Sequence, residues 1–308
     1  MTTASAVPIT RGEELEGDEA FATLRSVGRR RLVLDAVARF RAADGFSHSR
    51  ALAFQATLTL LPAIIALVGL AASLDQDTFA RVVEETIREV APGAVGDLLT
   101  EALRQGSRSA GEAALLGGGL AALLAGTTAM AQIERGANRI YGTERDRPFV
   151  HKYGVALVLT LTAGLLFVLA LVALVGGEAL QGTVGWSSGA ETAWDVVRWP
   201  LGLAFVVTSV ALLLEVAPKR RQPEPSWLAV GTAVSAVLWL GFMALLKVYV
   251  ELTEGFGATY GPLAGTIGVL LWTFLTSVAL FLGVAFAAQL EAVRAGVPDP
   301  RVAREEND

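Results

Sequence analysis

The sequence has no cysteine among its 308 residues, so disulfide frameworks, thiolate metal sites and cysteine nucleophiles are excluded. Charge is also scarce, because only 18% of the residues are Asp, Glu, Lys or Arg, whereas 53% are hydrophobic. A soluble domain of this length needs more charged side chains to solvate its surface. Together with a mean hydropathy of +0.51, this balance predicts a membrane protein.

Residues that carry chemistry are equally few. The two histidines, His48 and His151, do not form an HExxH pattern, and the sequence contains no Walker loop, GxSxG elbow or paired-carboxylate motif. The net charge of -5 argues against a nucleic-acid binder, which usually presents a basic face. We therefore predict a protein that is not an enzyme, with no catalytic, cofactor-binding or metal-binding residues and no nucleic-acid partner.

Six apolar blocks are long enough to cross a hydrocarbon core, which needs roughly 20 residues of helix. None of them shows the two-residue alternation of a barrel strand, so helices are required to satisfy the backbone in lipid. The sequence therefore predicts an all-α, polytopic membrane protein with one membrane domain over residues 29–291. The six spans run approximately over residues 51–74, 113–133, 153–177, 199–217, 227–250 and 263–290.

The Lys and Arg residues lie mainly in alternate flanks of these spans. Nineteen of the 25 fall in the amino-terminal segment, the second and fourth connections and the carboxyl-terminal tail, and five fall on the opposite side. The positive-inside rule then predicts a cytoplasmic-membrane protein with both termini in the cytoplasm. Residues 1–28 and 292–308 are expected to be cytoplasmic tails, the first of them flexible.

Two segments outside the spans are amphipathic. In residues 29–46, Leu32, Ala36 and Phe40 recur at helical spacing among arginines, which predicts either an interfacial helix on the inner membrane surface or a helix packed on the protein's own cytoplasmic loops. Residues 75–112 carry two apolar stripes separated by Pro92-Gly93 and predict an external helical hairpin. That hairpin could be a packing lid, guard a pathway mouth or capture a partner.

Polar residues in and just beyond the first two spans are the main candidates for a functional site. Such side chains could line a pathway, or they could join helices through hydrogen bonds, which is the more common use. Pro62 removes a backbone hydrogen bond, and the predicted kink would open a polar pocket beside Gln55 and Thr59. The candidates are Gln55, Thr57, Thr59, Pro62, Thr127, Thr128, Gln132, Glu134 and Asn138.

Two further features could serve packing or function. Glu215 and Lys247 lie near the ends of the fourth and fifth spans, where each can extend toward the interface, although an ionisable residue at membrane depth is also a functional candidate. Residues 255–262 are rich in Gly and could form a re-entrant stretch, which adds Tyr260, Gly261 and Gly265 to the candidate residues.

Short motifs recur in a fixed order around these spans. Residues 51–54 read Ala-Leu-Ala-Phe, 59–62 read Thr-Leu-Leu-Pro and 218–221 read Pro-Lys-Arg-Arg. The further motif residues are Asn138, Tyr141, Trp239, Tyr249, the run Tyr-Gly-Pro-Leu-Ala-Gly over 260–265, and Leu271-Trp272. Over roughly Leu32 to Glu291 the chain resembles the YihY/virulence factor BrkB family of bacterial inner-membrane proteins, long labelled ribonuclease BN.

The resemblance also shows departures. Relatives often carry Glu and then Asn near the end of the last span, where this chain is assigned Ala285 and Ala287, and a Lys in the fifth span, where it has Met243. If those polar groups serve transport in relatives, a change of substrate or loss of activity is implied here. The ribonuclease label is not supported by the residues, since none is placed to position a metal or a general base.

The sequence favours a role in envelope transport of a lipid or other amphiphile, because a mostly apolar pathway suits an amphiphile better than an ion. Membrane lipids are the expected partners, together with a second copy of the chain or another envelope protein. The alternative is a scaffold that captures partners through the external hairpin, and the remote alternative is a membrane-bound ribonuclease.

Overall fold

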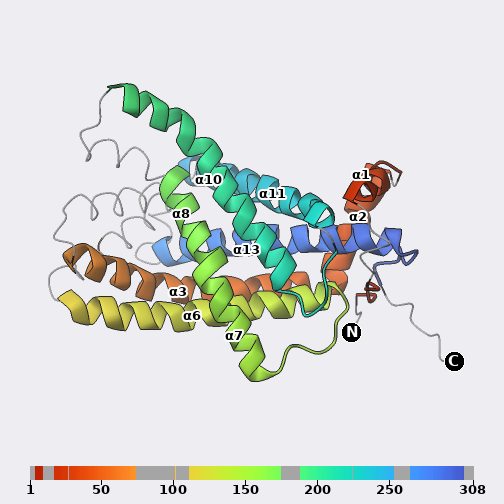
Figure 1. The fold of residues 1–308 in the computed structure, drawn as a ribbon, viewed down its shortest axis with the longest axis horizontal. Coiled ribbons are helices and arrows are strands. Elements are labelled where there is room, and N and C mark those ends of the chain that lie inside the picture. Colours follow the sequence, from red (N-terminus) through yellow and green to blue (C-terminus); the bar gives the residue numbers. More distant parts are fainter. Residues whose placement is uncertain are drawn as a thin grey trace.

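Long helices form almost all of the regular structure in the computed structural model (Figure 1). It describes residues 4–9, 17–26, 28–73, 101, 111–174, 188–223, 225–252 and 264–301. Within these residues the other regular feature is an isolated antiparallel bridge between Ala4 and Arg301. The all-α prediction is confirmed for this part of the chain.

The helices alternate with short connections in chain order. Ten helical elements are described: α1 (Gly17–Ser26), α2 (Arg29–Ala42), α3 (Gly45–Ser73), α6 (Gly111–Ile140), α7 (Phe149–Leu159), the π-helical turn η1 (Thr160–Gly164), α8 (Leu165–Leu174), α10 (Ser188–Val216), α11 (Pro225–Leu252) and α13 (Ala264–Arg294).

Five helical stretches are long and apolar enough to cross a membrane, which confirms a multi-pass membrane protein. They are Leu115–Ile140, Phe149–Leu174, Thr192–Val216, Trp227–Leu246 and Thr266–Arg294. The predicted first span, 51–74, falls almost entirely in the 29-residue helix α3, which continues across Pro62. A count of six spans stays a prediction, because α3 is not one of the five.

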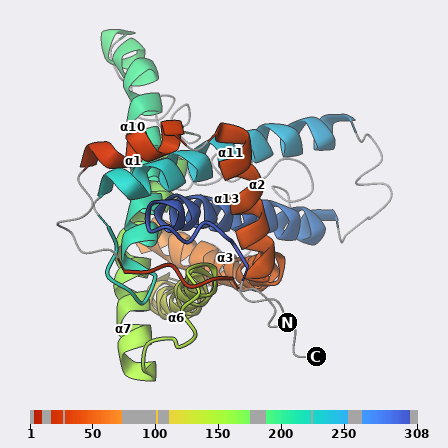
Figure 2. The same ribbon diagram turned by 90° about the vertical axis from the view of Figure 1, so that its right-hand side faces the viewer.

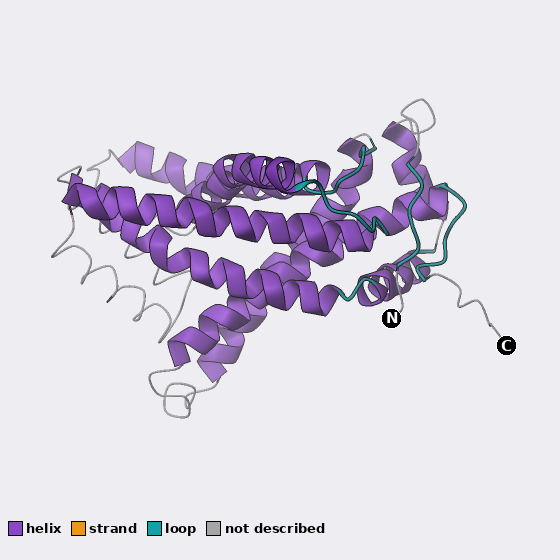
Figure 3. Ribbon diagram, turned by 90° about the horizontal axis from the view of Figure 1, so that it is seen from below, coloured by secondary structure: helices purple, strands orange, loops and turns teal. Residues whose placement is uncertain are grey.

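The helices form an elongated bundle. Helix α3 lies along α6, and α13 packs against both α3 and α11 (Figure 1). The stretch α7–η1–α8 and helix α10 pack on each other and cross the long axis of this group (Figure 1). Figure 3 shows the same bundle from below, with helices as almost all of its regular structure. The described terminal segments, residues 4–9 and 297–301, lie at the end of the bundle where α2 crosses α13 (Figure 2). We call this the basic end.

Small residues set the close approaches between helices, as is common in membrane bundles. A Cβ atom added at Gly118 of α6 would lie 2.7 Å from the backbone nitrogen of Ala66 in α3. Where α11 crosses α13, a Cβ at either Gly231 or Gly283 would lie 2.5 Å from the other residue's carbonyl oxygen. Gly117 and Gly119 have no neighbour within 4 Å at that position, so packing explains only some glycines of the second span.

A π-helical turn interrupts the third span. Within it, the carbonyl oxygen of Ala163 accepts a hydrogen bond of 2.8 Å from the buried hydroxyl of Ser209 in α10. Such turns arise where the regular i to i−4 ladder is locally displaced. The polar contact therefore joins two apolar helices at the point of the irregularity.

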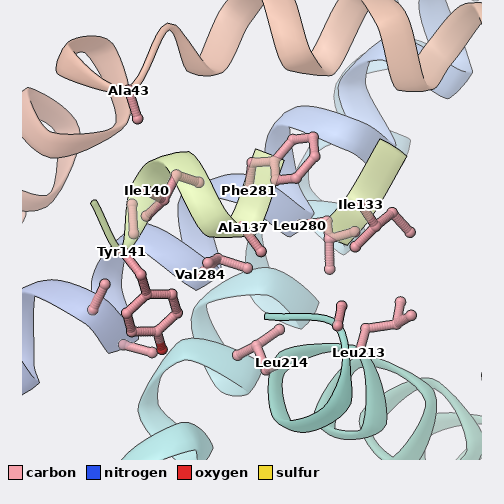
Figure 4. Close-up of a cluster of buried hydrophobic side chains, with 14 of the residues drawn as sticks. Ala43, Ile133, Ala137, Ile140, Tyr141, Leu213, Leu214, Leu280, Phe281 and Val284 are labelled. Carbon is pink, nitrogen blue, oxygen red and sulfur yellow. The ribbon is translucent and has the colours of Figure 1, made fainter. Parts of the chain in front are cut away.

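The main hydrophobic core lies toward the basic end, between α6, α10 and α13. Figure 4 shows Ile133, Ala137 and Ile140 of α6 facing side chains of the other two helices, with Tyr141 at one edge. The side chains that α10 and α13 contribute there are Leu213, Leu214, Leu280, Phe281 and Val284.

Parts of both terminal segments, for which cytoplasmic tails were expected, pack on the bundle. Residues 4–9 are extended and pack on the bundle, with Ala4 4% and Val7 6% exposed, and α1 is a helix whose Ala20 is buried against Trp227 and Leu290. Burial of these apolar side chains outweighs the polar composition that predicted a tail. At the other end, α13 continues to Arg294 and residues 297–301 return to the segment 4–9.

The segment 29–46 is not one helix. Helix α2 ends at Ala42, and Asp44 adopts a φ of 54°, a left-handed conformation that breaks the helix before α3 begins at Gly45. Leu32, Ala36 and Phe40 face the protein and are buried, while Val33, Leu34 and Val37 are exposed. The face that carries Leu32, Ala36 and Phe40 therefore packs on the protein, which is one of the two predicted alternatives.

Two other predicted segments lie outside the described residues. They are residues 75–112, apart from Glu101 and the start of α6, and residues 255–262.

Candidate functional site

A buried arginine organises the basic end. Arg39 of α2 is 0% exposed and donates Nε to Oε1 of Gln289 in α13 at 2.8 Å. Its Nη1 donates to the carbonyl oxygens of Ser5 at 2.8 Å and Ile140 at 3.2 Å. Burial lowers the pKa of Arg39 to about 10, so the guanidinium stays charged at neutral pH. One cation thus ties two helices to the amino-terminal segment and the end of α6.

An ion pair lies beside it. Nη2 of Arg220, in the turn between α10 and α11, contacts Oε1 of Glu291 at 2.5 Å, with the two side chains 3% and 1% exposed. The same guanidinium lies 4.5 Å from the ring centroid of Tyr141, a cation–π distance. Burial raises the pKa of Tyr141, which keeps its hydroxyl neutral. This arrangement balances a charge that burial would otherwise make costly.

Asn138 and Asp146 join the loop after α6 to the turn after α10. Asn138 is 0% exposed; its Nδ2 donates to Asp146 at 3.0 Å, and its Oδ1 accepts from the backbone nitrogen of Lys219 at 2.7 Å. Lys152 donates to the same carboxylate at 2.9 Å. Partial burial alone would raise the pKa of Asp146, but hydrogen bonds from Asn138, Lys152 and Arg135 outweigh it and lower that pKa to about 2.

Glu134 holds an arginine that caps α10. Oε2 of Glu134 lies 3.1 Å from Nη1 of Arg147, and its Oε1 accepts from the backbone nitrogen of Arg147 at 2.9 Å. The guanidinium donates to the carbonyl oxygens of Val216, Ala217 and Pro218 at 2.7 to 3.0 Å. The unpaired carbonyls of a helix end attract cations, so this contact stabilises the end of α10.

The amino-terminal segment closes over these charges. The backbone nitrogen of Val7 donates to the carbonyl oxygen of Tyr141 at 3.0 Å, and the hydroxyl of Ser5 donates to the carbonyl oxygen of Asp299. Gly142 has a φ of +72°, and a Cβ there would lie 2.5 Å from the Cα of Ala6. Only glycine allows both this turn and the close approach of the segment.

The polar candidates of the first two spans occupy different places. Thr57, Thr59 and Thr127 each bond the carbonyl four residues earlier in their own helices, and Thr57 also contacts the hydroxyl of Thr273 in α13 at 3.1 Å. Thr128 lies on the exposed side of α6 and bonds the carbonyl of Ala125. Oε1 of Gln55 is buried with no hydrogen-bond partner among the described residues. The structure therefore does not bring this set together around one cavity.

Gln132 meets a histidine rather than another member of the set. Its Nε2 lies 3.2 Å from Nδ1 of His48, near the start of α3. Burial lowers the pKa of His48 and favours the neutral ring, in which Nδ1 can accept the amide hydrogen. Of the other candidates, Pro62 lies inside α3, Gly265 is the second residue of α13, and Tyr260 and Gly261 lie outside the described residues.

The family departures have structural counterparts. Two polar residues spaced by two, Gln289 and Glu291, lie near the end of α13 four residues beyond Ala285 and Ala287, which are buried in the apolar core. The sulfur of Met243 accepts a 2.9 Å hydrogen bond from Nε1 of Trp272, so that position contacts a second motif residue.

A groove lies away from this network, on the outer surface between α10 and α11. It has a volume of about 210 Å³. Glu215 is exposed at the basic end of α10, and Thr232 is 4% exposed, with a hydroxyl that has no described hydrogen-bond partner. The lining is Val207, Ala211, Glu215, Leu228, Ala229, Thr232 and Ala233, so the groove is apolar apart from these two side chains.

Several of these residues were not among the sequence candidates. Arg39, Arg147, Gln289 and Glu291 lie in segments where positive-inside topology or an apolar span already explained the composition. One signal was available for Arg39, because it follows Leu32 and Ala36 by seven and three residues and so shares their apolar stripe. An arginine in a stripe that packs on the protein must be paired.

Comparison with known proteins shows which family the chain belongs to. The chain is 26% identical over 265 residues to the ribonuclease-like protein YfkH of Bacillus subtilis (strain 168), a match that covers 85% of this chain and 95% of the relative. No solved structure matches. Residues 36–306 match the family described as Virulence factor BrkB, and the chain therefore belongs to the BrkB family.

Proposed function

We propose that this chain is a multi-pass protein of the bacterial cytoplasmic membrane that moves a lipid or similar amphiphile, without catalysing a chemical reaction. The observation that carries the proposal is the groove between α10 and α11. It opens on a surface of two helices whose apolar stretches are long enough to span a membrane. An acyl chain can enter it directly from the bilayer.

The charge distribution supports this topology. The described Lys and Arg contacts of the loop 141–148, the turn 217–223 and both terminal segments gather at the basic end. Under the positive-inside rule that end faces the cytoplasm, together with both termini. Six crossings, with α3 as the first, return the chain to the side on which it started.

The ribonuclease-like name of the relative calls for a separate argument. Among the described residues no three His, Asp or Glu side chains gather as a metal site would require. Glu134 is 2% exposed and engaged by Arg147, so it is not free to act as a general base. We expect purified protein to leave RNA intact with Mg²⁺ or Mn²⁺. Cleavage that is lost in Glu134→Gln and His151→Ala variants would contradict this.

Lipid movement is tested in vesicles. The purified protein is reconstituted with a trace of fluorescent phospholipid, and the transfer of label between leaflets is compared with protein-free vesicles. Ala233→Phe should fill the groove and slow transfer, whereas Val237→Phe, one turn further along α11 and 69% exposed outside the groove, should not. Equal rates in all three proteins and in empty vesicles would contradict the proposal.

The scaffold alternative depends on residues 75–112. No described contact supports it over lipid movement, and it is tested by capture of envelope proteins after replacement of the stripe Phe79, Val83 and Ile87.

A further inference from the structure

We infer that the groove between α10 and α11 binds a lipid whose headgroup carries a primary amine, with Glu215 and Thr232 as its polar ligands. The inference rests on the proposed function, because it names the chemistry that the same groove would recognise. Its first basis is the arrangement of the lining. Val207 and Glu215 are eight residues apart, or about 12 Å along the helix, so the groove runs from the basic end toward the middle of α10.

Thr232 is the second basis. Threonine and serine hydroxyls inside helices commonly bond the carbonyl four residues earlier. Thr127, Thr160 and Thr273 all do so here. The Thr232 hydroxyl makes no such bond, although the residue is 4% exposed and lines the groove. A buried hydroxyl without a partner costs free energy, so a ligand in the groove that hydrogen-bonds to it gains that energy.

Glu215 is the third basis. It lies one residue before the end of the span Thr192–Val216 and makes no ion pair or hydrogen bond with the described part of the chain. Its carboxylate is exposed near the membrane interface, and every other lining residue except Thr232 is apolar. A cation that comes from outside the chain can therefore pair with it at the end of the groove.

The chemistry of these two groups selects the headgroup. An ionised carboxylate only accepts hydrogen bonds, and a threonine hydroxyl can also accept. A primary ammonium supplies both positive charge and N–H donors, whereas a choline headgroup has no N–H and a glycerol headgroup leaves the lipid anionic. Charge-assisted hydrogen bonds are roughly twice as strong as neutral ones. The volume of about 210 Å³ holds only part of a lipid, so the remaining chain stays in the bilayer.

Native mass spectrometry of the full-length protein in mild detergent tests the inference. The protein is equilibrated with phosphatidylethanolamine, phosphatidylcholine and phosphatidylglycerol that have the same acyl chains, and the retained lipid is counted. We expect preferential retention of the ethanolamine lipid. Glu215→Gln should weaken it about tenfold, the equivalent of one charge-assisted hydrogen bond. Thr232→Val should weaken it less, because it removes a neutral group.

Matched variants separate the site from general effects. Glu144→Gln removes the same charge from an exposed loop position, and Thr162→Val removes an exposed hydroxyl that already bonds the carbonyl of Val158. Both should retain lipid like the unmodified protein. Equal retention of the three lipids, or equal loss in Glu215→Gln and Glu144→Gln, would overturn the inference.

The vesicle assay distinguishes this inference from the proposed function. Amine-selective retention that depends on Glu215, without transfer between leaflets, would keep the binding site and refute transport. Transfer that is blocked by Ala233→Phe but shows no headgroup preference would keep transport and refute the amine site.

Discussion

Arg220 and Glu291 illustrate how the protein tolerates charge in its interior. Both side chains are almost fully buried, and the guanidinium also lies over the ring of Tyr141. Removing one partner of such a pair leaves a buried charge, at a cost of about 3–5 kcal/mol, whereas replacing both with apolar residues costs much less. The pair is therefore a sensitive point in the stability of the basic end.

We expect Arg220→Met to lower the free energy of unfolding strongly and the double change Arg220→Met with Glu291→Leu to recover most of the loss. Unfolding can be followed by helix content during titration with a denaturing detergent. Arg221→Met is the control, because Arg221 is the exposed neighbour. Glu291→Leu is also measured alone. If the losses of Arg220→Met and Glu291→Leu add up to the loss of the double variant, the two residues are not coupled.

His48 makes the stability of the protein depend on pH. Its pKa is lowered from 6.5 by burial, so the unfolded chain binds a proton that the folded chain resists. Stability is then fully present above pH 6.5 and falls as the pH drops below it. We expect the midpoint temperature of thermal unfolding to be lower at pH 5.5 than at pH 7.5. This decrease should be smaller in His48→Gln. His151→Gln, at the exposed second histidine, should behave like the unmodified protein.

At the scale of elements, the crossing of α11 and α13 depends on two glycines. We expect Gly283→Ala to destabilise the protein by about 1–3 kcal/mol, because the added methyl group meets Ser235 and the backbone of α11. Gly241 lies on α11, the helix that Gly283 of α13 packs against, and a Cβ there has nothing within 4 Å, so Gly241→Ala should be neutral or stabilising. Denaturation of the two variants side by side measures the difference. A loss for both would indicate a general intolerance of alanine.

The contacts of the terminal segments have no local signal in the sequence. Residues 4–9 lack helical periodicity, and their partners lie at Tyr141 and at residues 299–300, far away in sequence. Backbone hydrogen bonds to such distant groups leave no local pattern. The alternation of apolar blocks and charged connections, by contrast, is local and located α6, α11 and α13 closely.

At the scale of the whole molecule, the absence of cysteine makes the topology directly measurable. Single cysteines can be placed at Glu144, in the loop after α6, and at Ala190, near the start of α10. We expect a membrane-impermeant maleimide to label Ala190→Cys in intact spheroplasts and to label Glu144→Cys only after the membrane is opened. The unmodified protein gives the background. The opposite pattern would place the basic end outside.

The sequence alone determined that this is an α-helical membrane protein, because helix length, hydropathy and the placement of Lys and Arg are set by the bilayer and can be counted residue by residue. The motifs also included Asn138, Tyr141 and residues 218–221, which the structure places at the basic end. Tertiary structure decided which polar residues meet. Arg39 of α2 meets Gln289 of α13, and Arg220 of the turn after α10 meets Glu291 of α13. Glu215 and Thr232 line one groove from two different helices. Only the packing of the chain brings each of these pairs together.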